Sequence, residues 1–316
     1  MEKILITGAL GQIGTELTQR LVNLFGKENV IALDIKDNPT TSAGFYEKID
    51  IANTELISQI IDKYQITIVY HLASLLSGTS EKNPQLAWKL NIEPLLYFLE
   101  LAKERKINKL FWPSSIAVFG KGISKHDVGQ EVVLNPTTVY GISKLAGERW
   151  CEYYHEKYGV DVRSIRYPGI ISWKTPAGGG TTDYAVEIFY KAVEDGKYTS
   201  FISENSALPM LYIEDAINAT IQLMNAPKEQ ITVRSSYNLG GLSFTPKQLS
   251  DEIKKIITDF EMTYEPDFRQ AIADSWPASI DDSIAKKDWG LTYEFGIGEM
   301  SEDMIKMVEI VGNAMQ

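Results

Sequence analysis

Short apolar runs alternate with longer amphipathic segments along the first half of the chain. Five runs have the length and β-branched content of strands: KILIT, VIALD, TIVYHLA, KLFWPSS and VDVRSIRY. Between them, apolar residues recur at helical spacing near residues 12–24, 54–64, 84–105 and 139–157. Strands that alternate with helices form parallel sheets with helices on both faces, so the pattern predicts an α/β fold with a doubly wound parallel sheet.

The pattern loosens after Trp173, where TPAGGGTTDY has the composition of a loop. Further elements are predicted as helices near 183–195 and 246–258 and as a strand within SYNLGG, near 236–240. We therefore expect residues 1–172 to form the first domain and residues 173–316 to form mainly a smaller, interleaved substrate-binding part. We expect the strand near 236–240 to rejoin the sheet.

A glycine-rich turn, TGALGQIG, follows the first strand and precedes an amphipathic helix. Gly8, Gly11 and Gly14 permit a tight turn, let backbone N–H groups approach a pyrophosphate and allow the helix to lie close on the sheet. The alternative is a merely structural turn, but strand, turn and helix occur in the order that a dinucleotide site requires. We predict a Rossmann-type dinucleotide site that includes Gln12 and Ile13.

The second strand ends at Asp34, whose carboxylate would bind the free ribose hydroxyls of NAD and repel the 2′-phosphate of NADP. NAD is therefore the predicted cofactor. Lys36 would favour an extra phosphate, but it is interpreted as a solvated neighbour. His71 is interpreted as a packed core residue. Other cofactor contacts are predicted at the same edge of the sheet and in RYPGIIS: Lys36, Asp50, Ile51, Leu72, Ala73, Tyr167, Pro168 and Ile170.

In VYGISKLAGE, Tyr140 and Lys144 stand four positions apart at the start of a predicted helix and share one face of it. Such a pair is often only a half-exposed tyrosine and a solvated lysine. Beside a nicotinamide, however, alcohol oxidation needs a base for the hydroxyl proton. A free tyrosine has a pKa of about 10. An adjacent ammonium and the helix N-terminus would lower this pKa, so Tyr140 is the predicted general base.

Ser114 and Ser115 end the strand in FWPSSIAVFG. With the TGxxGxxG turn and the YxxxK pair, this strand-end hydroxyl makes essentially the whole chain resemble the extended branch of the short-chain dehydrogenase/reductase superfamily. The resemblance implies that Ser115 orients the substrate oxygen, that Tyr140 is the base and that Lys144 also binds the nicotinamide ribose. Ser114 is the rival for the serine role. It lies on the other side of the strand if the strand persists, so Ser115 is preferred.

Several C-terminal stretches are similar to the threonine 3-dehydrogenases of this superfamily: RYPGIIS, PAGGGTTDYAVEIF, LPMLYIEDAI and RQAIADSWPASIDDSIAKKDWGL. The similarity implies NAD-dependent oxidation of L-threonine at its β-carbon to 2-amino-3-oxobutyrate, commonly in a homodimer. Several of those relatives carry threonine where this chain has Ser115, and either hydroxyl can serve.

The stretch GGGTTDY, residues 178–184, is interpreted as a lid over the substrate. Its glycines can expose backbone N–H groups to a carboxylate, and its threonines can add hydroxyl donors. An ordinary mobile loop is the alternative. The predicted substrate-binding residues are Ser77, Ser115, Tyr140, Gly180, Thr181, Thr182 and Trp276.

Two rival functions differ in what they require. A nucleotide-sugar epimerase or dehydratase must hold a diphosphate, which suits arginine, but only Arg234 and Arg269 follow Trp173. A non-catalytic NAD sensor has no need for Ser115, Tyr140 and Lys144 together.

Composition narrows the partners and the location. A net charge of −11 disfavours nucleic acid and anionic membranes. A single cysteine, Cys151, and three scattered histidines predict no metal site. With no apolar run long enough to span a membrane and no signal-like start, we expect a cytoplasmic protein.

Overall fold

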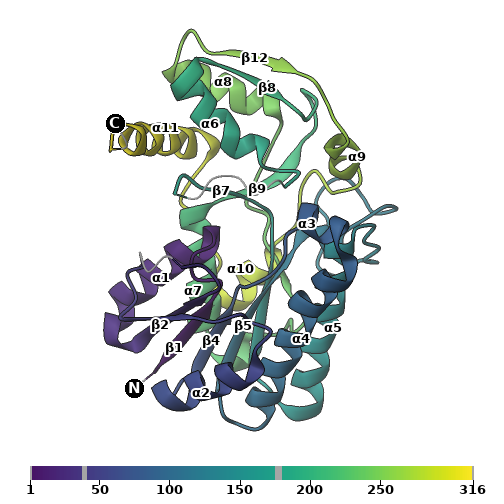
Figure 1. Ribbon diagram of the computed structural model, residues 1–316. Helices are drawn as coiled ribbons and strands as arrows, with labels where there is room; N and C mark the ends of the chain where they lie inside the picture. Colours follow the sequence, from purple (N-terminus) through teal and green to yellow (C-terminus); the bar gives the residue numbers. More distant parts are fainter. Residues whose placement is uncertain (1, 38–40, 175–179, 315–316) are drawn as a thin grey trace.

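The computed structural model describes residues 2–37, 41–174 and 180–314. Its centre is a sheet of seven parallel strands (Figure 1). In spatial order the strands are β3 (Phe45–Lys48), β2 (Val30–Asp34), β1 (Ile4–Thr7), β4 (Ile68–His71), β5 (Lys109–Ser115), β6 (Val162–Tyr167) and β10 (Tyr237–Asn238). The predicted doubly wound α/β fold is confirmed.

Helices cover both faces of this sheet. The helices on one face are α1 (Gln12–Phe25) and α7 (Ile213–Asn225), and those on the other are α2 (Thr54–Tyr64), α4 (Pro84–Lys103) and α5 (Val139–Tyr158). Side chains of a strand point alternately to opposite faces. Accordingly, Ile4 and Ile6 pack with Leu17 of α1, whereas Leu5 belongs to the core formed with Ile57 of α2. Full burial of such a side chain contributes about 1.5–3 kcal/mol.

The smaller part lies above the carboxyl edge of the sheet in Figure 1. It contains α6 (Tyr184–Asp195), α8 (Pro246–Ile256), α11 (Ile297–Ala314) and two small sheets, one of β8 (Lys197–Ser200) and β12 (Glu261–Tyr264), the other of β7 (Gly169–Ile171), β9 (Leu208–Tyr212) and β11 (Leu242–Phe244). Short helices complete the described chain: α3 (Ser77–Lys82), α9 (Arg269–Ala273), α10 (Ser283–Trp289), and the 3-10 turns Lys27–Asn29, Ile116–Val118 and Lys228–Gln230.

Two elements from the C-terminal half belong to the larger part. The β10 strand pairs with β6, and α7 packs against α1 and β6. The domain boundary near residue 172 stays a prediction. Strand order reverses between β1 and β4, because β1 continues to β2 on one side while β4 continues to β5 on the other. In open parallel sheets, the crevice at such a switch point is where ligands bind.

Candidate active site

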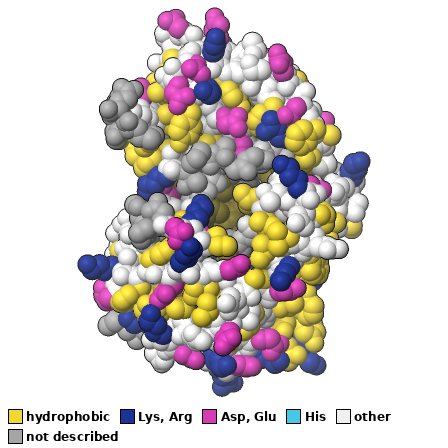
Figure 2. All heavy atoms as spheres, in the orientation of Figure 1, with side chains coloured by type: hydrophobic (Ala, Val, Ile, Leu, Met, Phe, Trp, Pro, Cys, Tyr) yellow, Lys and Arg dark blue, Asp and Glu magenta, His cyan; other side chains and the backbone are white. Residues whose placement is uncertain are grey.

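A cavity of about 520 Å³ lies at the carboxyl ends of β1, β2, β4 and β5, between the sheet and the smaller part. Figure 2 shows the hollow between the two parts, with hydrophobic side chains on its inner wall. All of the residues predicted from the sequence to bind cofactor or substrate, or to catalyse, line this cavity: Gly8, Gly11, Gln12, Ile13, Gly14, Asp34, Lys36, Asp50, Ile51, Leu72, Ala73, Ser77, Ser115, Tyr140, Lys144, Tyr167, Pro168, Ile170, Gly180, Thr181, Thr182 and Trp276.

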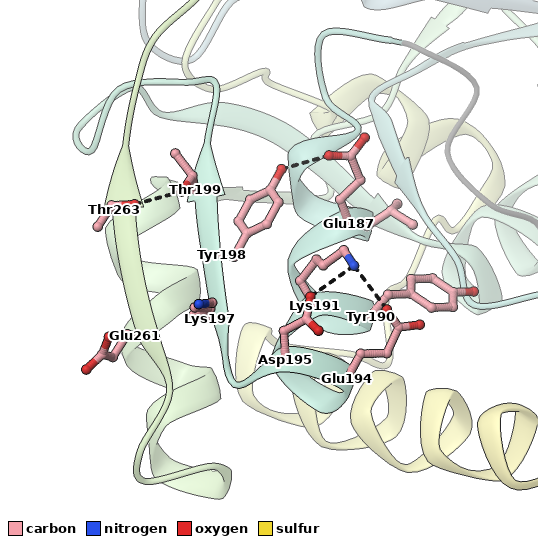
Figure 3. A pocket seen from close by; sticks show the side chains of 11 residues that line it. Glu187, Tyr190, Lys191, Glu194, Asp195, Lys197, Tyr198, Thr199, Glu261 and Thr263 are labelled. Carbon is pink, nitrogen blue, oxygen red and sulfur yellow. Dashed lines mark hydrogen bonds and ion pairs between the residues drawn. The ribbon is translucent and has the colours of Figure 1, made fainter.

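A second hollow of about 600 Å³ lies between α6, β8 and β12 (Figure 3). None of the predicted site residues lines it. Lys191 pairs there with Glu194 and Asp195, and Tyr198 donates a hydrogen bond to Glu187. These side chains are already paired with one another, so the first cavity is the better candidate for chemistry.

The glycine turn has the shape that a dinucleotide needs. Gly8 has a φ of +68°, and a side chain there would bring its Cβ within 2.8 Å of the Ala73 nitrogen. A Cβ on Gly14 would overlap the Gly8 carbonyl oxygen. Gly11 is the capping residue immediately before α1, and no described side chain caps this helix end. The backbone N–H groups at the start of α1 can therefore receive a pyrophosphate.

Asp34 lies at the end of β2 and is only 8% exposed. Its Oδ2 accepts a hydrogen bond from the Leu10 nitrogen at 3.0 Å, and its Oδ1 accepts from the Ile35 and Lys36 nitrogens at 2.8 and 3.2 Å. Asp34 thus borders the cavity and also stabilises the glycine turn through its hydrogen bond with Leu10. The sequence did not predict this stabilising role.

Tyr140 and Ser115 meet at the centre of the cavity wall. The Thr138 hydroxyl oxygen caps α5 by accepting from the Gly141 nitrogen at 3.0 Å, and this fixes the turn that carries Tyr140. Burial raises the pKa of Tyr140 to about 12, although a hydrogen bond with the Ser115 side chain opposes the rise. The phenol is therefore neutral near pH 7 in this arrangement.

Lys144 is 1% exposed, and its Nζ donates to the Pro113 carbonyl oxygen at 2.8 Å. Nζ also lies 4.6 Å from the centre of the Trp112 ring. Burial lowers the pKa of Lys144 to about 7. The expectation that this ammonium lowers the pKa of Tyr140 is therefore wrong for this structure, because removal from water disfavours the charged form of both groups.

The two neighbouring serines have different surroundings. Ser114 donates from Oγ to Glu148 Oε1 at 2.6 Å, and Glu148 forms a two-pronged ion pair with Arg166 at 2.9 and 2.8 Å. Glu148 and Arg166 are both buried. The Ser115 Oγ instead accepts from the Ala117 nitrogen at 3.2 Å and reaches Tyr140. This geometry favours Ser115 over Ser114 for the substrate.

Sequence reasoning missed Asn91, a buried residue of α4 that links the cavity wall to α5. Its Oδ1 accepts from the Leu75 nitrogen at 2.8 Å, and its Nδ2 donates to the Leu75 oxygen and to Ser143 Oγ at 3.2 and 3.3 Å. Ser143 in turn donates to the Tyr140 carbonyl oxygen at 2.7 Å. The signal in the sequence was only a polar residue flanked by two apolar ones, Leu90 and Ile92.

His71 is buried, as interpreted from the sequence, and stacks near Phe98 at 5.0 Å between ring centres. Its Nδ1 shares a hydrogen bond with Thr7 Oγ1 at 2.8 Å, and burial lowers its pKa to about 3. Among the described residues, no group of three or more His, Cys, Asp or Glu side chains could hold a metal ion. No helix in the described ranges has the length and apolar character to cross a membrane.

The substrate end of the cavity is formed by residues from separate segments. Thr181 is buried, the Gly180 nitrogen donates to Asp183 Oδ2 at 2.6 Å, and Trp276 is 8% exposed. Gly178 and Gly179 of the predicted lid lie outside the described residues. The lid stays a prediction.

A doubly wound sheet, a glycine turn after its first strand, and a Ser–Tyr–Lys group in one cavity define an oxidoreductase that uses a nicotinamide cofactor. The model of the NAD dependent epimerase/dehydratase family matches residues 4–240, and the chain belongs to this family. The predicted resemblance to extended short-chain dehydrogenases/reductases is thereby confirmed.

Named relatives include a protein called an uncharacterized epimerase/dehydratase from Staphylococcus haemolyticus, which is 46% identical over 98% of both chains. A solved L-threonine dehydrogenase from Cupriavidus necator, in its holo form, is 50% identical with a TM-score of 0.94, covering 96% of this chain and 99% of that one. A monomeric L-threonine 3-dehydrogenase from a metagenome is 48% identical, also with a TM-score of 0.94, covering 98% and 99%.

Proposed function

We propose that this protein oxidises L-threonine at its β-carbon to 2-amino-3-oxobutyrate with NAD as the hydride acceptor. One observation carries the proposal: Ser115, Tyr140 and Lys144 share a single cavity that no arginine among the described residues lines. The solved relatives named as L-threonine dehydrogenases support the same substrate.

The absence of arginine from the described cavity wall argues against the nucleotide-sugar alternative. An epimerase or dehydratase of that kind must neutralise a diphosphate, for which arginine is best suited. Both arginines that follow Trp173 form ion pairs with residues that do not line the cavity. Arg234 pairs with Asp161 at 2.9 Å, and Arg269 pairs with Asp267 at 2.7 Å while it stacks on Phe201.

In the proposed reaction, Tyr140 first loses its phenol proton to solvent, at a cost set by its raised pKa. The bond between the β-carbon and its hydrogen then breaks as hydride leaves, and the β-hydroxyl proton passes to the Oη of the Tyr140 phenolate. Ser115 Oγ hydrogen-bonds the same substrate oxygen and holds it beside the phenol. Lys144 hydrogen-bonds the nicotinamide ribose. When bound, oxidised NAD supplies a hydride acceptor and a positive charge, held by the glycine turn and by Asp34.

The carboxylate of a small amino acid needs donors at the other end of the cavity. We propose that Ser77, Gly180, Thr181 and Thr182 supply them and that Trp276 closes the wall, because all five line the same cavity as Ser115 and Tyr140. A cytoplasmic homodimer is also part of the proposal. Cys151, the single cysteine, is buried and unpaired, as is usual in a reducing compartment.

An absorbance assay tests the proposal. The purified protein should accumulate NADH from L-threonine and NAD, and Tyr140→Phe should lower kcat by about 10²- to 10⁴-fold because proton abstraction is lost. Tyr97→Phe, which alters a tyrosine bonded to Ser58, is the matched control and should stay active. An epimerase returns the hydride to its product, so turnover of a nucleotide sugar without net NADH, and no NADH from threonine, would overturn the assignment.

A further inference from the structure

Beyond the residues that line the cavity, we propose that Lys125 is a positioning residue that holds Trp276 in place at the substrate end. The proposal rests on the proposed function only for its kinetic consequence. Lys125 does not line the cavity, so it would act on the substrate through Trp276 alone.

The side chain of Lys125 hydrogen-bonds to the segment that carries Trp276. Its Nζ donates to the Trp276 carbonyl oxygen at 2.8 Å and to the Asp274 carbonyl oxygen. Asp274 immediately follows α9, where the last carbonyl groups of a helix have no partner within the helix. An ammonium offers three donors, so one lysine can satisfy two such oxygens at once.

Backbone hydrogen bonds continue this contact after Trp276. The Lys125 carbonyl oxygen accepts from the Ala278 and Ser279 nitrogens at 2.6 and 3.2 Å. Val128 then donates to the Ser279 oxygen at 3.1 Å and accepts from the Asp281 nitrogen at 3.0 Å. This backbone ladder begins two residues past Trp276, whereas the Lys125 ammonium reaches Trp276 itself.

The position of Lys125 in the chain explains why these hydrogen bonds can affect the substrate end of the cavity. Lys125 lies in the connection between β5, which ends at Ser115, and α5, which begins beside Tyr140. Trp276 follows α9 in the smaller part, and the hydrogen bonds from Lys125 join this segment to the larger part. The Lys125 ammonium therefore holds Trp276, which forms part of the cavity wall, in place relative to the catalytic side chains. Small displacements of such a wall impair binding and orientation of a small substrate.

Kinetics on the full-length protein give the first test. Lys125→Met keeps the length of the side chain but removes all donors, and it should raise KM for L-threonine about fivefold with kcat within about twofold of wild type. The dissociation constant of NAD should not change, because Trp276 is not among the residues predicted to bind NAD. Lys125→Arg keeps several donors and should restore KM.

A matched control separates this effect from the general loss of a lysine. Lys228 also donates to a backbone carbonyl, that of Gly159 at 3.0 Å, but it lies outside the cavity, and Lys228→Met should leave KM unchanged. An equal rise of KM in Lys228→Met, or no rise in Lys125→Met, would overturn the proposal.

Amide hydrogen exchange tests the positioning role without threonine turnover. Exchange in residues 274–282 should be faster in Lys125→Met than in wild type and unchanged in Lys228→Met. If wild type forms no NADH from threonine, the proposed function fails while this measurement still decides the role of Lys125. Identical exchange in wild type and Lys125→Met would refute that role.

Discussion

The Nζ atom of Lys144 lies 5.4 Å from the centre of the Tyr140 ring, yet burial shifts both groups toward their neutral forms. The pKa of Lys144 falls to about 7 and that of Tyr140 rises to about 12. The pair is thus not preassembled as ammonium and phenolate. The hydrogen bond to Pro113 and the Trp112 ring support the ammonium when it is charged.

This low pKa of Lys144 predicts a pH dependence of stability. Lys144 titrates near pH 7 when folded and near 10.5 when unfolded, so between these values the unfolded chain binds the extra proton. The free energy of unfolding should therefore rise with pH across this window, by up to about 1.4 kcal/mol per pH unit. Below pH 7 both states carry the charge, so the free energy of unfolding no longer changes with pH through Lys144, and the cost of burying the charged ammonium is present in full.

Urea unfolding of wild type and Lys144→Met at pH 6.5 and pH 9 measures the contribution. The difference in unfolding free energy between the two proteins should shift by roughly 2 kcal/mol in favour of wild type at pH 9. Lys228→Met, which removes an exposed lysine, controls for the general change in charge. Parallel pH profiles for wild type and Lys144→Met would show that Lys144 keeps an ordinary pKa.

Asp34 is predicted to select NAD over NADP. Because Asp34 also accepts from the Leu10 nitrogen, Asp34→Ala would weaken the selectivity and disturb the glycine turn together. Asp34→Asn keeps an acceptor oxygen and removes the charge. We expect it to reduce the NAD-to-NADP ratio of kcat/KM by about 10- to 100-fold, consistent with 1.5–3 kcal/mol for hydrogen bonds to a charged group.

Asp37→Asn is the control for Asp34→Asn. Asp37 stands close by in the sequence but is exposed and pairs with Lys48. Its replacement should leave the cofactor preference unchanged. An equal preference in wild type and Asp34→Asn would mean that another residue makes the selection.

The sequence predicted features that depend mainly on residues close together in the chain. The first glycine turn is one, since Gly8 needs a left-handed φ and close approach to Ala73. The buried Glu148–Arg166 pair could not be predicted, because it joins α5 to β6 and nothing in the sequence shows that these two distant residues meet. Removal of one partner of such a pair costs about 3–5 kcal/mol.

The small three-stranded sheet was missed for a related reason. Its strands β7, β9 and β11 are short and come from distant parts of the chain, so their pairing depends on tertiary packing. The pKa of Tyr140 was predicted in the wrong direction because spacing shows that Lys144 is near but does not show that both polar ends are removed from water.

Thr182 is predicted to bind the substrate through its hydroxyl. Thr182→Val keeps the shape that packs against Gly169, where an added Cβ would lie 2.6 Å from Thr182 Cβ, and removes only the donor. We expect kcat/KM for L-threonine to fall about tenfold, as for one lost hydrogen bond to a charged group. The dissociation constant of NAD should stay constant.

Thr199→Val provides the matched control, because Thr199 bonds to Thr263 in the second hollow, away from the cavity (Figure 3). Steady-state kinetics and NAD titration on both variants give the result. A parallel loss of NAD affinity in Thr182→Val, or full threonine activity, would contradict the prediction that Thr182 binds the substrate.

A homodimer is the last prediction, and the outer face of α4 and α5 is the surface that we expect it to bury. On α5, Ile142, Trp150 and Tyr153 follow helical spacing on one side and are 49%, 38% and 45% exposed. Leu86 and Trp88 of α4 are similarly exposed but, two positions apart, point to different sides of that helix, and α4 lies beside α5 (Figure 1). Exposed apolar side chains gathered on one side of a helix, as on α5, mark an interaction site, and a two-fold axis would pair this side with itself.

Sedimentation velocity tests this interface. Wild type should sediment with twice the chain mass, whereas Tyr153→Glu should sediment as a monomer, because two carboxylates would be buried near the two-fold axis without partners. Ile256→Glu places the same charge at an exposed apolar position on α8 and should leave the dimer intact. One relative is named a monomeric enzyme. A wild-type monomer would contradict the prediction. It would mean that this chain resembles that relative in its oligomeric state and that α4 and α5 do not form a dimer interface.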